Sequence, residues 1–426
     1  MKSKNLFMIL VVAALVFAIY NMINNSKKAN ANQPSTSTQD VGNNSNGDSN
    51  QNTPTIDTNS NKIIISTMLE NKGTYDYTNK IVDLGVPLSA KYPGESENNV
   101  LSRNVWDLQA YNNKIYIGSG DYDKNTGPVD IYSYNTLTNQ FVKEVTVDDE
   151  QINRFVIIDG KLMAPGIDRH SGGWDLGNYY VLENGKWTTK TIKDAIHNFD
   201  LIKYNGALYA GIGNDSDSSI IKTTDNGNSW SYVYMYDING NKITVTEANS
   251  AYTRVYDLFE FKNNLYAISN YKIYKYIQSD NIFKEMNNKV VSFGSSPVLF
   301  YFPLKTKMQY KNNMVFVNGM IGYTNDLENF TYTSFDRYSS VNDMVEVNNE
   351  LYVLCNTVID NVTYVSVYKT NDLTTWNPVM YFEYTDPAKS FEFVNNAFYF
   401  GFGSTRGSFT TTTIANSGRI IKVPMN

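Results

Sequence analysis

The sequence predicts an all-β fold, a seven-bladed β-propeller whose blades are four-stranded antiparallel sheets. A phrase consisting of an alternating strand, a tight turn and an apolar strand recurs seven times after residue 104. Aromatic residues, which suit the pleated and half-buried surface of a strand, make up 14% of the chain, with 33 Tyr and 21 Phe. A single ring of repeats therefore accounts for most of the 426 residues.

The copies of the phrase have a regular spacing. They begin at Val105, Phe199, Tyr256 and Asn342 in their clearest form, and at Arg154, Met308 and Ser390 in weaker form. Aligned on the residue after the turn, they run from Tyr116 to Tyr399 with a mean interval of about 47 residues, which is the range of propeller blades. Solenoid repeats are shorter, and a β-sandwich does not repeat seven times.

Each copy reads as a hairpin followed by two further strands. N-N, N-G or D-G turns separate the first two strands, and strings such as D-I-Y-S-Y-N and Q-F-V-K-E-V follow them. The last copy ends at G-R-I-I-K-V and is one strand short. We expect the N-terminal segment 62–85, which contains K-I-I-I-S and K-I-V-D-L, to complete that blade and close the ring.

The N-terminus has the features of an export signal. Lys2 and Lys4 precede an apolar run from Leu6 to Ile23. Ala29-Asn30-Ala31 has the form of a signal-peptidase site, whereas the length of the run also suits a membrane anchor. Residues 1–31 are thus a signal peptide or an N-terminal anchor, and no cysteine follows that could carry a lipid. Both alternatives predict an extracellular protein, secreted or held at the membrane by this segment alone.

Residues 24–61 are predicted to be a disordered linker. Asn, Ser, Thr, Gln, Asp and Gly dominate the segment, and it has too little apolar surface to offset the entropy of ordering the chain. The propeller domain then spans residues 62–426.

Charge and cysteine content exclude several classes. The net charge is −6, and the basic residues are scattered rather than gathered on one stretch, so nucleic acid is not an expected partner. Cys355 is the only cysteine and lies in the apolar run L-Y-V-L-C, so we interpret it as a buried packing residue. We expect no cofactor.

One turn carries a family resemblance. Thr223-Thr224-Asp225-Asn226-Gly227-Asn228-Ser229-Trp230 matches the pattern S/T-x-D-x-G-x-S/T-W, and degenerate forms lie at 324–330 and 370–376. The chain resembles the Asp-box (BNR-like) propellers of the sialidase-like superfamily over roughly residues 100–426. In that group the box is structural, so the resemblance implies a fold and leaves function open. The R-I-P motif of sialidases does not occur here.

The candidate site lies on the loop face, by which we mean the connections that enter each first strand and those between second and third strands. The long polar loops from Gly120, Gly166, Gly213 and Gly403 all belong to it. Arg103, Arg154, Arg254 and Arg337 precede or begin first strands, which predicts a basic cluster at the channel mouth that recognises an anion. Alternatively, each Arg pairs with an Asp of a neighbouring blade.

Two histidines and a tryptophan extend the candidate site. His170 and His197 lie in neighbouring connections, and with Asp168 and Asp200 they could bind a divalent metal or provide a general base. Alternatively, the two histidines are unrelated. Trp174 could stack on a sugar or anchor its own loop. An Asp recurs at one repeat position, and we interpret it as an acceptor that locks blades together; its copies are Asp107, Asp200, Asp257 and Asp343.

These features predict an exported or cell-surface recognition module that binds a glycan or an extracellular protein through the loop face. The ligand-binding residues we expect are Arg103, Arg154, Arg254, His170, His197, Asp168 and Trp174. The alternative is a glycan-cleaving enzyme, a sialidase-like hydrolase or a polysaccharide lyase, with its site on the same face. A structural propeller without a pocket is a third possibility.

Overall fold

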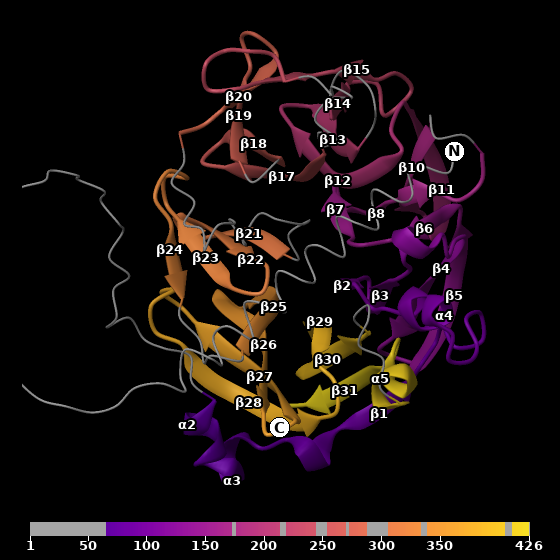
Figure 1. Cartoon of the computed structure of the whole chain (residues 1–426), viewed down its shortest axis with the longest axis vertical. Helices are drawn as coiled ribbons and strands as arrows, with labels where there is room; N and C mark the ends of the chain where they lie inside the picture. The colour runs from indigo at the N-terminus through magenta and orange to yellow at the C-terminus, as the bar shows by residue number, and fades with distance from the viewer. Residues whose placement is uncertain are drawn as a thin grey trace, which may run out of the picture. The chain divides into compact units, whose positions relative to one another are not determined.

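The computed structural model describes residues 65–172, 176–213, 219–243, 254–269, 272–287, 306–333, 339–404 and 411–425. Seven antiparallel sheets follow one another around a central channel, which confirms the predicted seven-bladed propeller (Figure 1). The predicted signal or anchor segment and the predicted linker lie outside the described residues. Among the residues that are described, no helix is both long and apolar enough to cross a membrane.

The blades follow the order of the seven repeats. Blade 1 consists of β2 (Asp107–Tyr111), β3 (Lys114–Gly118), β4 (Val129–Asn135) and β5 (Gln140–Val147). Blade 2 consists of β7 (Val156–Ile158), β8 (Lys161–Pro165), β10 (Leu176–Glu183) and β11 (Lys186–Lys193). Blade 3 consists of β12 (His197–Tyr204), β13 (Ala207–Gly213), β14 (Ile220–Thr223) and β15 (Ser231–Tyr232). Blade 4 consists of β17 (Val255–Phe261), β18 (Asn264–Ser269), β19 (Lys272–Ile277) and β20 (Ile282–Glu285), with β16 (Tyr234–Tyr236) added in parallel at its outer edge.

The remaining blades are built in the same way. Blade 5 consists of β21 (Thr306–Tyr310), β22 (Asn313–Val317), β23 (Ile321–Thr324) and β24 (Thr331–Thr333). Blade 6 consists of β25 (Ser339–Val347), β26 (Glu350–Ile359), β27 (Val362–Thr370) and β28 (Asn377–Tyr384). Blade 7 consists of β29 (Ala388–Val394), β30 (Ala397–Phe402), β31 (Ile420–Pro424) and β1 (Val82–Gly85).

The ring closes by pairing the two ends of the propeller. β1 is antiparallel to β31, with Val82 opposite Lys422 and Asp83 opposite Ile421. This confirms the prediction that the N-terminal segment supplies the strand that the last repeat lacks. The K-I-V-D-L string therefore forms the closing strand. The K-I-I-I-S string ends instead at the short helix α2 (Ser66–Leu69), which is followed by α3 (Lys72–Tyr75). Both short helices contact β28 on the outer edge of blade 6.

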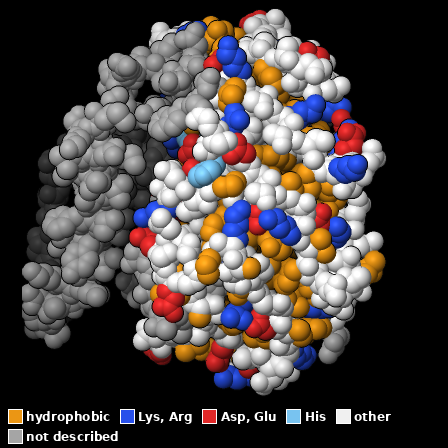
Figure 2. Space-filling view, turned by 90° about the vertical axis from the view of Figure 1, so that its right-hand side faces the viewer, with side chains coloured by type: hydrophobic (Ala, Val, Ile, Leu, Met, Phe, Trp, Pro, Cys, Tyr) orange, Lys and Arg blue, Asp and Glu red, His pale blue; other side chains and the backbone are white. Residues whose placement is uncertain are grey.

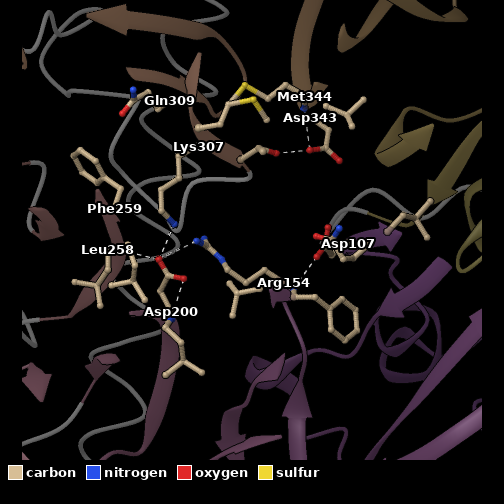
Figure 3. Close-up of a pocket in the computed structure, with 18 of the residues that line it drawn as sticks. Asp107, Arg154, Asp200, Leu258, Phe259, Lys307, Gln309, Asp343 and Met344 are labelled. Atoms are coloured by element: carbon tan, nitrogen blue, oxygen red, sulfur yellow. Dashed lines mark hydrogen bonds and ion pairs between the residues drawn. The ribbon is translucent and has the colours of Figure 1, made fainter. Parts of the chain in front are cut away.

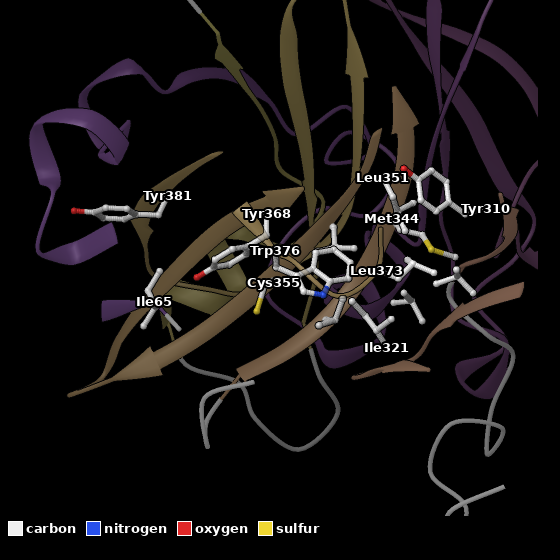
Figure 4. Packing of buried hydrophobic residues seen from close by; sticks show 14 of the residues in the cluster. Ile65, Tyr310, Ile321, Met344, Leu351, Cys355, Tyr368, Leu373, Trp376 and Tyr381 are labelled. Atoms are coloured by element: carbon white, nitrogen blue, oxygen red, sulfur yellow. The ribbon is translucent and has the colours of Figure 1, made fainter. Parts of the chain in front are cut away.

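Hydrophobic side chains fill the interfaces between blades. The described residues form seven buried clusters, one at each junction of neighbouring blades. Figure 4 shows the junction of blades 5 and 6, where Trp376 and Leu373 pack with Ile321, and Ile65 joins from the N-cap position of α2. Cys355 belongs to this cluster and is buried, which confirms its predicted packing role.

The tight turns have the backbone that their sequences predict. Asn112 and Asn113 both have positive φ between β2 and β3, and so do Asn348 and Asn349 between β25 and β26. Asparagine tolerates this left-handed region better than most residues, and paired positive φ values give the turn type that favours two-residue hairpins. These turns leave little room for a site on their side of the ring.

The loop face of blades 1 to 3 contains additional strands that the repeats did not predict. β6 (Asp149–Gln151), from the connection into blade 2, pairs with β9 (Ile167–Arg169), from the loop between β8 and β10. β9 in turn pairs with β12, where Ile167 lies opposite His197. The sheet of blade 3 thus continues through β9 to β6, and ordinary backbone pairing holds these connections in place.

Candidate functional site

The central channel contains a cavity of about 450 Å³ lined by the first strands of all seven blades. Figure 3 shows Arg154 and Lys307 pointing toward Asp200 within it. Arg154 lies 2.7 Å from Asp257 and 3.5 Å from Asp200, and Lys307 lies 2.7 Å from Asp200 and 2.9 Å from Asp257. Burial alone would lower the pKa of Arg154, but the two carboxylates raise it overall. Both cations are therefore already balanced by carboxylates of the scaffold.

The recurring Asp residues join neighbouring blades, as predicted. Asp107 accepts a hydrogen bond from the backbone N–H of Phe155 at 2.7 Å, and Asp200 accepts one from Leu258 at 2.8 Å. Asp343 accepts one from Phe391 at 3.1 Å. Each donor lies in the first strand of the next blade or, for Phe155, immediately before it, so these carboxylates are structural acceptors rather than part of a free acidic site.

Arg103 does not join Arg154 in the channel. Its guanidinium donates to the carbonyl oxygens of Tyr92 at 2.8 Å, Gly94 at 3.0 Å and Ile414 at 3.1 Å. It follows α4 (Glu97–Ser102), and it connects that region to α5 (Thr411–Asn416) across the junction of blades 7 and 1. Burial lowers its pKa. The structure thus places Arg103 in the scaffold, away from Arg154.

A different polar cluster lies on the loop face of blades 1 to 3. In the β6–β9 pair, Asp149 is opposite Arg169 and Gln151 is opposite Ile167. This pairing brings Glu150 and Asp168 close enough for the charge of Asp168 to act on Glu150. His170 Nδ1 lies 3.3 Å from Glu150 Oε1, and His197 Nδ1 lies 3.5 Å from Asp168 Oδ1. Figure 2 shows this side of the propeller, where acidic side chains flank an imidazole.

Burial and like charge perturb both carboxyls of this pair. Burial, followed by the charges of Asp168, Asp149 and Asp121, raises the pKa of Glu150 to about 8. Burial raises the pKa of Asp168 to about 6, although the positive charge of Arg254 opposes the shift. The pKa of His197 is lowered to about 3, first by burial and then by Arg254, so this imidazole is neutral at physiological pH.

The backbone of the cluster is closely packed and partly strained. Asp168 has a φ of +63°, in the left-handed region that few non-glycine residues adopt. Gly120 has a φ of +110°, and a Cβ there would lie 2.2 Å from the carbonyl oxygen of Glu150. This glycine therefore lets the loop of blade 1 approach β6 at backbone distance. Non-glycine strain of this kind is common at functional sites.

The outcome for the predicted site residues is mixed. Asp168, His170, His197 and Arg254 gather around one cluster, and Arg254 Cζ lies 5.9 Å from the ring centre of Phe199. Trp174 and Arg337 lie outside the described residues. Glu150 was missed because it lies in a connecting segment that has no counterpart in the other repeats; the only sequence signal was the acidic run Asp148-Asp149-Glu150.

The cluster does not have the arrangement of a metal site. Within the described ranges, no group of three or more His, Cys, Asp or Glu side chains converges closely enough to hold a metal ion. Asp200, which we had considered with the two histidines, is bound instead to Lys307 and to the backbone of blade 4.

The predicted Asp-box turn joins β14 and β15 on the face opposite the site. Asp225 accepts hydrogen bonds from the Ser229 N–H at 2.9 Å and the Ser229 hydroxyl at 2.6 Å, and Gly227 has a φ of +85°. Trp230 packs edge-on against Tyr179 of blade 2. The two degenerate turns are one residue shorter, and Leu327 and Leu373 take the positive φ in them with their side chains buried.

The chain was compared with known proteins at the level of sequence and of fold. No model of a known protein family matches it, and no curated protein sequence does. Among solved structures it is similar to the extracellular domain of a hybrid two component system from B. thetaiotaomicron, with 14% identity, a TM-score of 0.45, and coverage of 75% of this chain and 38% of that one. The chain thus spans well under half the length of that protein.

Two further structures show the same range of similarity. A chain of the Mitotic Checkpoint Complex has 11% identity and a TM-score of 0.47, with 82% of this chain and 94% of that chain covered. An ulvan lyase of polysaccharide lyase family PL25 has 11% identity and a TM-score of 0.41, with 80% and 94% covered. Similarity at this level identifies no ligand and no activity.

Proposed function

We propose that this protein is an exported recognition module of the Asp-box propeller type, which binds a glycan through the loop face of blades 1 to 3. The observation that carries the proposal is the cross-strand pair of Glu150 and Asp168, flanked by His170 and His197. Two acids held close together by three paired strands repel each other when both are ionised, so this arrangement suggests selection for binding.

Aromatic side chains beside the pair suit a sugar ligand. The ring of Tyr122 lies 6.0 Å from that of His197 and is partly exposed. Trp106 donates its indole N–H to the carbonyl oxygen of Gly120 at 2.7 Å, but Lys389 Nζ lies 4.8 Å from the centre of its ring, so Tyr122 is the aromatic side chain on which the proposal rests. Sugar rings pack on aromatic faces while their hydroxyls donate to carboxylates, and binding sites commonly combine the two.

The channel is a weaker candidate than the loop face. The anion-binding cluster that the arginines predicted would need cations without partners, but Arg154 and Lys307 each contact two carboxylates. Placing an anion there would break buried ion pairs, which is costly. The proposal therefore moves the ligand from the channel to the loop cluster.

A second candidate function is cleavage of the glycan. A general acid needs a carboxyl that is still protonated near neutral pH, and the pKa of Glu150 is raised to about 8. The facing Asp168 has the lower pKa of the two and would be the ionised partner that a two-carboxylate glycosidase requires. This candidate uses the same residues and predicts turnover in addition to binding.

A glycan array probed with the purified protein tests the binding function. We expect retention of at least one glycan class, with loss of binding in Glu150→Gln and unchanged binding in Glu183→Gln, whose exposed carboxylate pairs with Lys161 on the opposite face. Binding that survives Glu150→Gln and Asp168→Asn would place the ligand elsewhere. Retention of proteins but of no glycan would favour a protein partner.

Incubation of the retained glycan with the protein separates binding from cleavage. New reducing ends would indicate hydrolysis, and new unsaturated ends would indicate a lyase.

Export is tested independently by fractionating cells that produce the full chain, where we expect the propeller on the outer side of the membrane or in the medium. Recovery in the cytoplasm would contradict the export part of the proposal.

A further inference from the structure

We propose that the ligand of the loop cluster carries a protonated primary amine, and that the glycan recognised is one with free amino sugars. The inference rests on the proposed glycan-binding function and specifies the chemical group that Glu150 and Asp168 recognise. It follows from the charges around Glu150, from polar atoms without partners, and from the number of acceptors that the cluster offers.

The surroundings of Glu150 are negative. The charged groups that raise the pKa of this carboxyl are the acids Asp168, Asp149 and Asp121, and the one base in contact with it is His170, whose Nδ1 lies 3.3 Å from Oε1. Arg169 is engaged by Asp148 at 3.1 Å, and Arg254 acts on Asp168 and His197. A cation placed beside Glu150 would therefore relieve repulsion, whereas an anionic or uronic acid group would increase it.

Two polar atoms of the cluster have no hydrogen-bond partner among the described residues. They are Oε2 of Glu150 and Nδ1 of His197. Their side chains are only 7% and 9% exposed, so water has limited access to them. Buried polar atoms are normally satisfied, and an unpartnered carboxylate oxygen beside another carboxylate is a place where a donor is missing.

An ammonium group matches this deficit better than a metal ion does. It has three N–H donors, and the cluster offers three acceptors in the carboxylates of Glu150 and Asp168 and the neutral imidazole of His197. Two of these acceptors are enough to hold an ammonium group at hydrogen-bond distance, whereas a metal ion needs at least three side chains that converge on one point, which the described residues do not provide. The side chain of Asp168 is 26% exposed and His170 is 36% exposed, so the cluster can be approached from solvent past these two residues.

An aromatic side chain beside the acceptors favours a sugar, rather than a lysine side chain, as the carrier of the amine. Tyr122 lies against His197, so a ring carrying the amine would have a flat surface beside the acceptors. A glucosamine unit has such a ring with an amine attached directly to it. A lysine ε-ammonium supplies the same charge on a flexible stem with no ring to stack, and it is the competing source.

The experiment compares two oligosaccharides that differ in one group. Calorimetric titrations of the full chain with a glucosamine hexamer and with an N-acetylglucosamine hexamer are expected to differ at least about tenfold in affinity, in favour of the free amine. Glu150→Gln and Asp168→Asn should each remove that preference. Asp159→Asn, which removes an exposed carboxylate on the opposite turn face, should keep it.

Proton release gives a readout that a structural role would not affect. Glu150, with a pKa of about 8, is largely protonated at pH 7 in the free site and must ionise to hold an ammonium group. Titration at about pH 5.5, where the amine of the sugar and Glu150 are both protonated before binding, in buffers of different ionisation enthalpy should therefore show about one proton released by Glu150. Glu150→Gln should abolish this release, and thermal melting of each variant confirms that it is folded.

The outcomes separate this inference from the proposed function. Equal affinity for both hexamers, or binding without proton release, overturns the amine while glycan binding stands. Capture of another glycan with no binding of either hexamer also overturns it. Equally tight binding of a tetralysine peptide overturns the assignment to an amino sugar, and failure to bind any glycan overturns both proposals.

Discussion

The guanidinium of Arg154 in blade 2 lies 2.7 Å from the carboxylate of Asp257 in blade 4, so this ion pair extends past blade 3. Asp200 of the intervening blade 3 lies 3.5 Å from Arg154, and Lys307 of blade 5 contacts both aspartates. Four consecutive blades are thus joined through one buried group of charges. Because each member depends on the others for its solvation, the group behaves as a unit.

The first prediction concerns this group. Arg154→Met should lower the free energy of unfolding by about 3 kcal/mol, because it removes one of the two cations that contact both buried aspartates. Urea denaturation measures the loss. Adding Asp257→Asn to the same chain should restore part of the stability, since the unbalanced carboxylate is removed. Lys161→Ala, which breaks the exposed pair with Glu183, should cost less than about 1 kcal/mol.

The second prediction concerns closure of the ring. A chain beginning at Thr78 keeps β1 and should retain a cooperative melt, with a modest loss from the missing packing of Ile65 and Met68 on blade 6. A chain beginning at Val86 lacks β1 and leaves β31 as an unpaired edge. It should melt at a much lower temperature and aggregate on heating. Equal melting temperatures for the two truncations would show that β1 is dispensable.

The architecture of the ring could be predicted because the repeat encodes it locally. In each repeat, the strand that follows the N-N, N-G or D-G turn lies where the sequence predicts it. The last repeat lacks one strand after Ile420, and this identified β1 as the strand that closes the ring. The recurring Asp was predictable for the same reason, since one position in each repeat faces the next blade. Asp107, Asp200 and Asp343 all accept from a neighbouring first strand.

The candidate site was harder to predict because it is not part of the repeat. The pairing of β6 with β9 brings Glu150 and Asp168 together from two connecting segments, and nothing in their local sequences specifies a strand. Arg103 was misleading for a related reason. It precedes the first strand of blade 1 by several residues, and its guanidinium binds the carbonyl oxygens of Tyr92 and Ile414, which belong to the segment before blade 1 and to the connection between β30 and β31.

The third prediction compares two glycines to separate backbone strain from steric crowding, one in the turn between β14 and β15 and one in the turn after β16. Gly227 and Gly240 have nearly the same φ, +85° and +86°, but a Cβ at Gly227 would lie 2.4 Å from the Tyr179 hydroxyl, whereas nothing lies within 4 Å at Gly240. Gly240→Ala should cost about 1 kcal/mol from backbone strain alone. Gly227→Ala should cost about 2–3 kcal/mol, because it also displaces the buried Tyr179 that packs on Trp230. Equal losses of unfolding free energy in urea would show that Tyr179 can move at the junction of blades 2 and 3 without a measurable loss of stability.

The last prediction is the pH dependence of stability that Glu150 imposes. Its pKa rises from 4.5 to about 8 in the folded protein, so between these values the folded state holds more protons than the unfolded chain. Stability from this group is therefore complete below about pH 4.5 and is lost as the pH rises through 8. His197 acts in the opposite direction, because its pKa is lowered to about 3 and its contribution to stability is lost as the pH falls below 6.5.

Urea denaturation between pH 6.5 and 8.5 therefore measures the contribution of the carboxyl groups to stability without that of His197. We expect the wild type to lose stability across this interval and Glu150→Gln to lose less, by about 1–2 kcal/mol at the upper end. A Glu150→Gln profile parallel to that of the wild type would show that Glu150 is ionised throughout and that its repulsion from Asp168 is relieved by other groups.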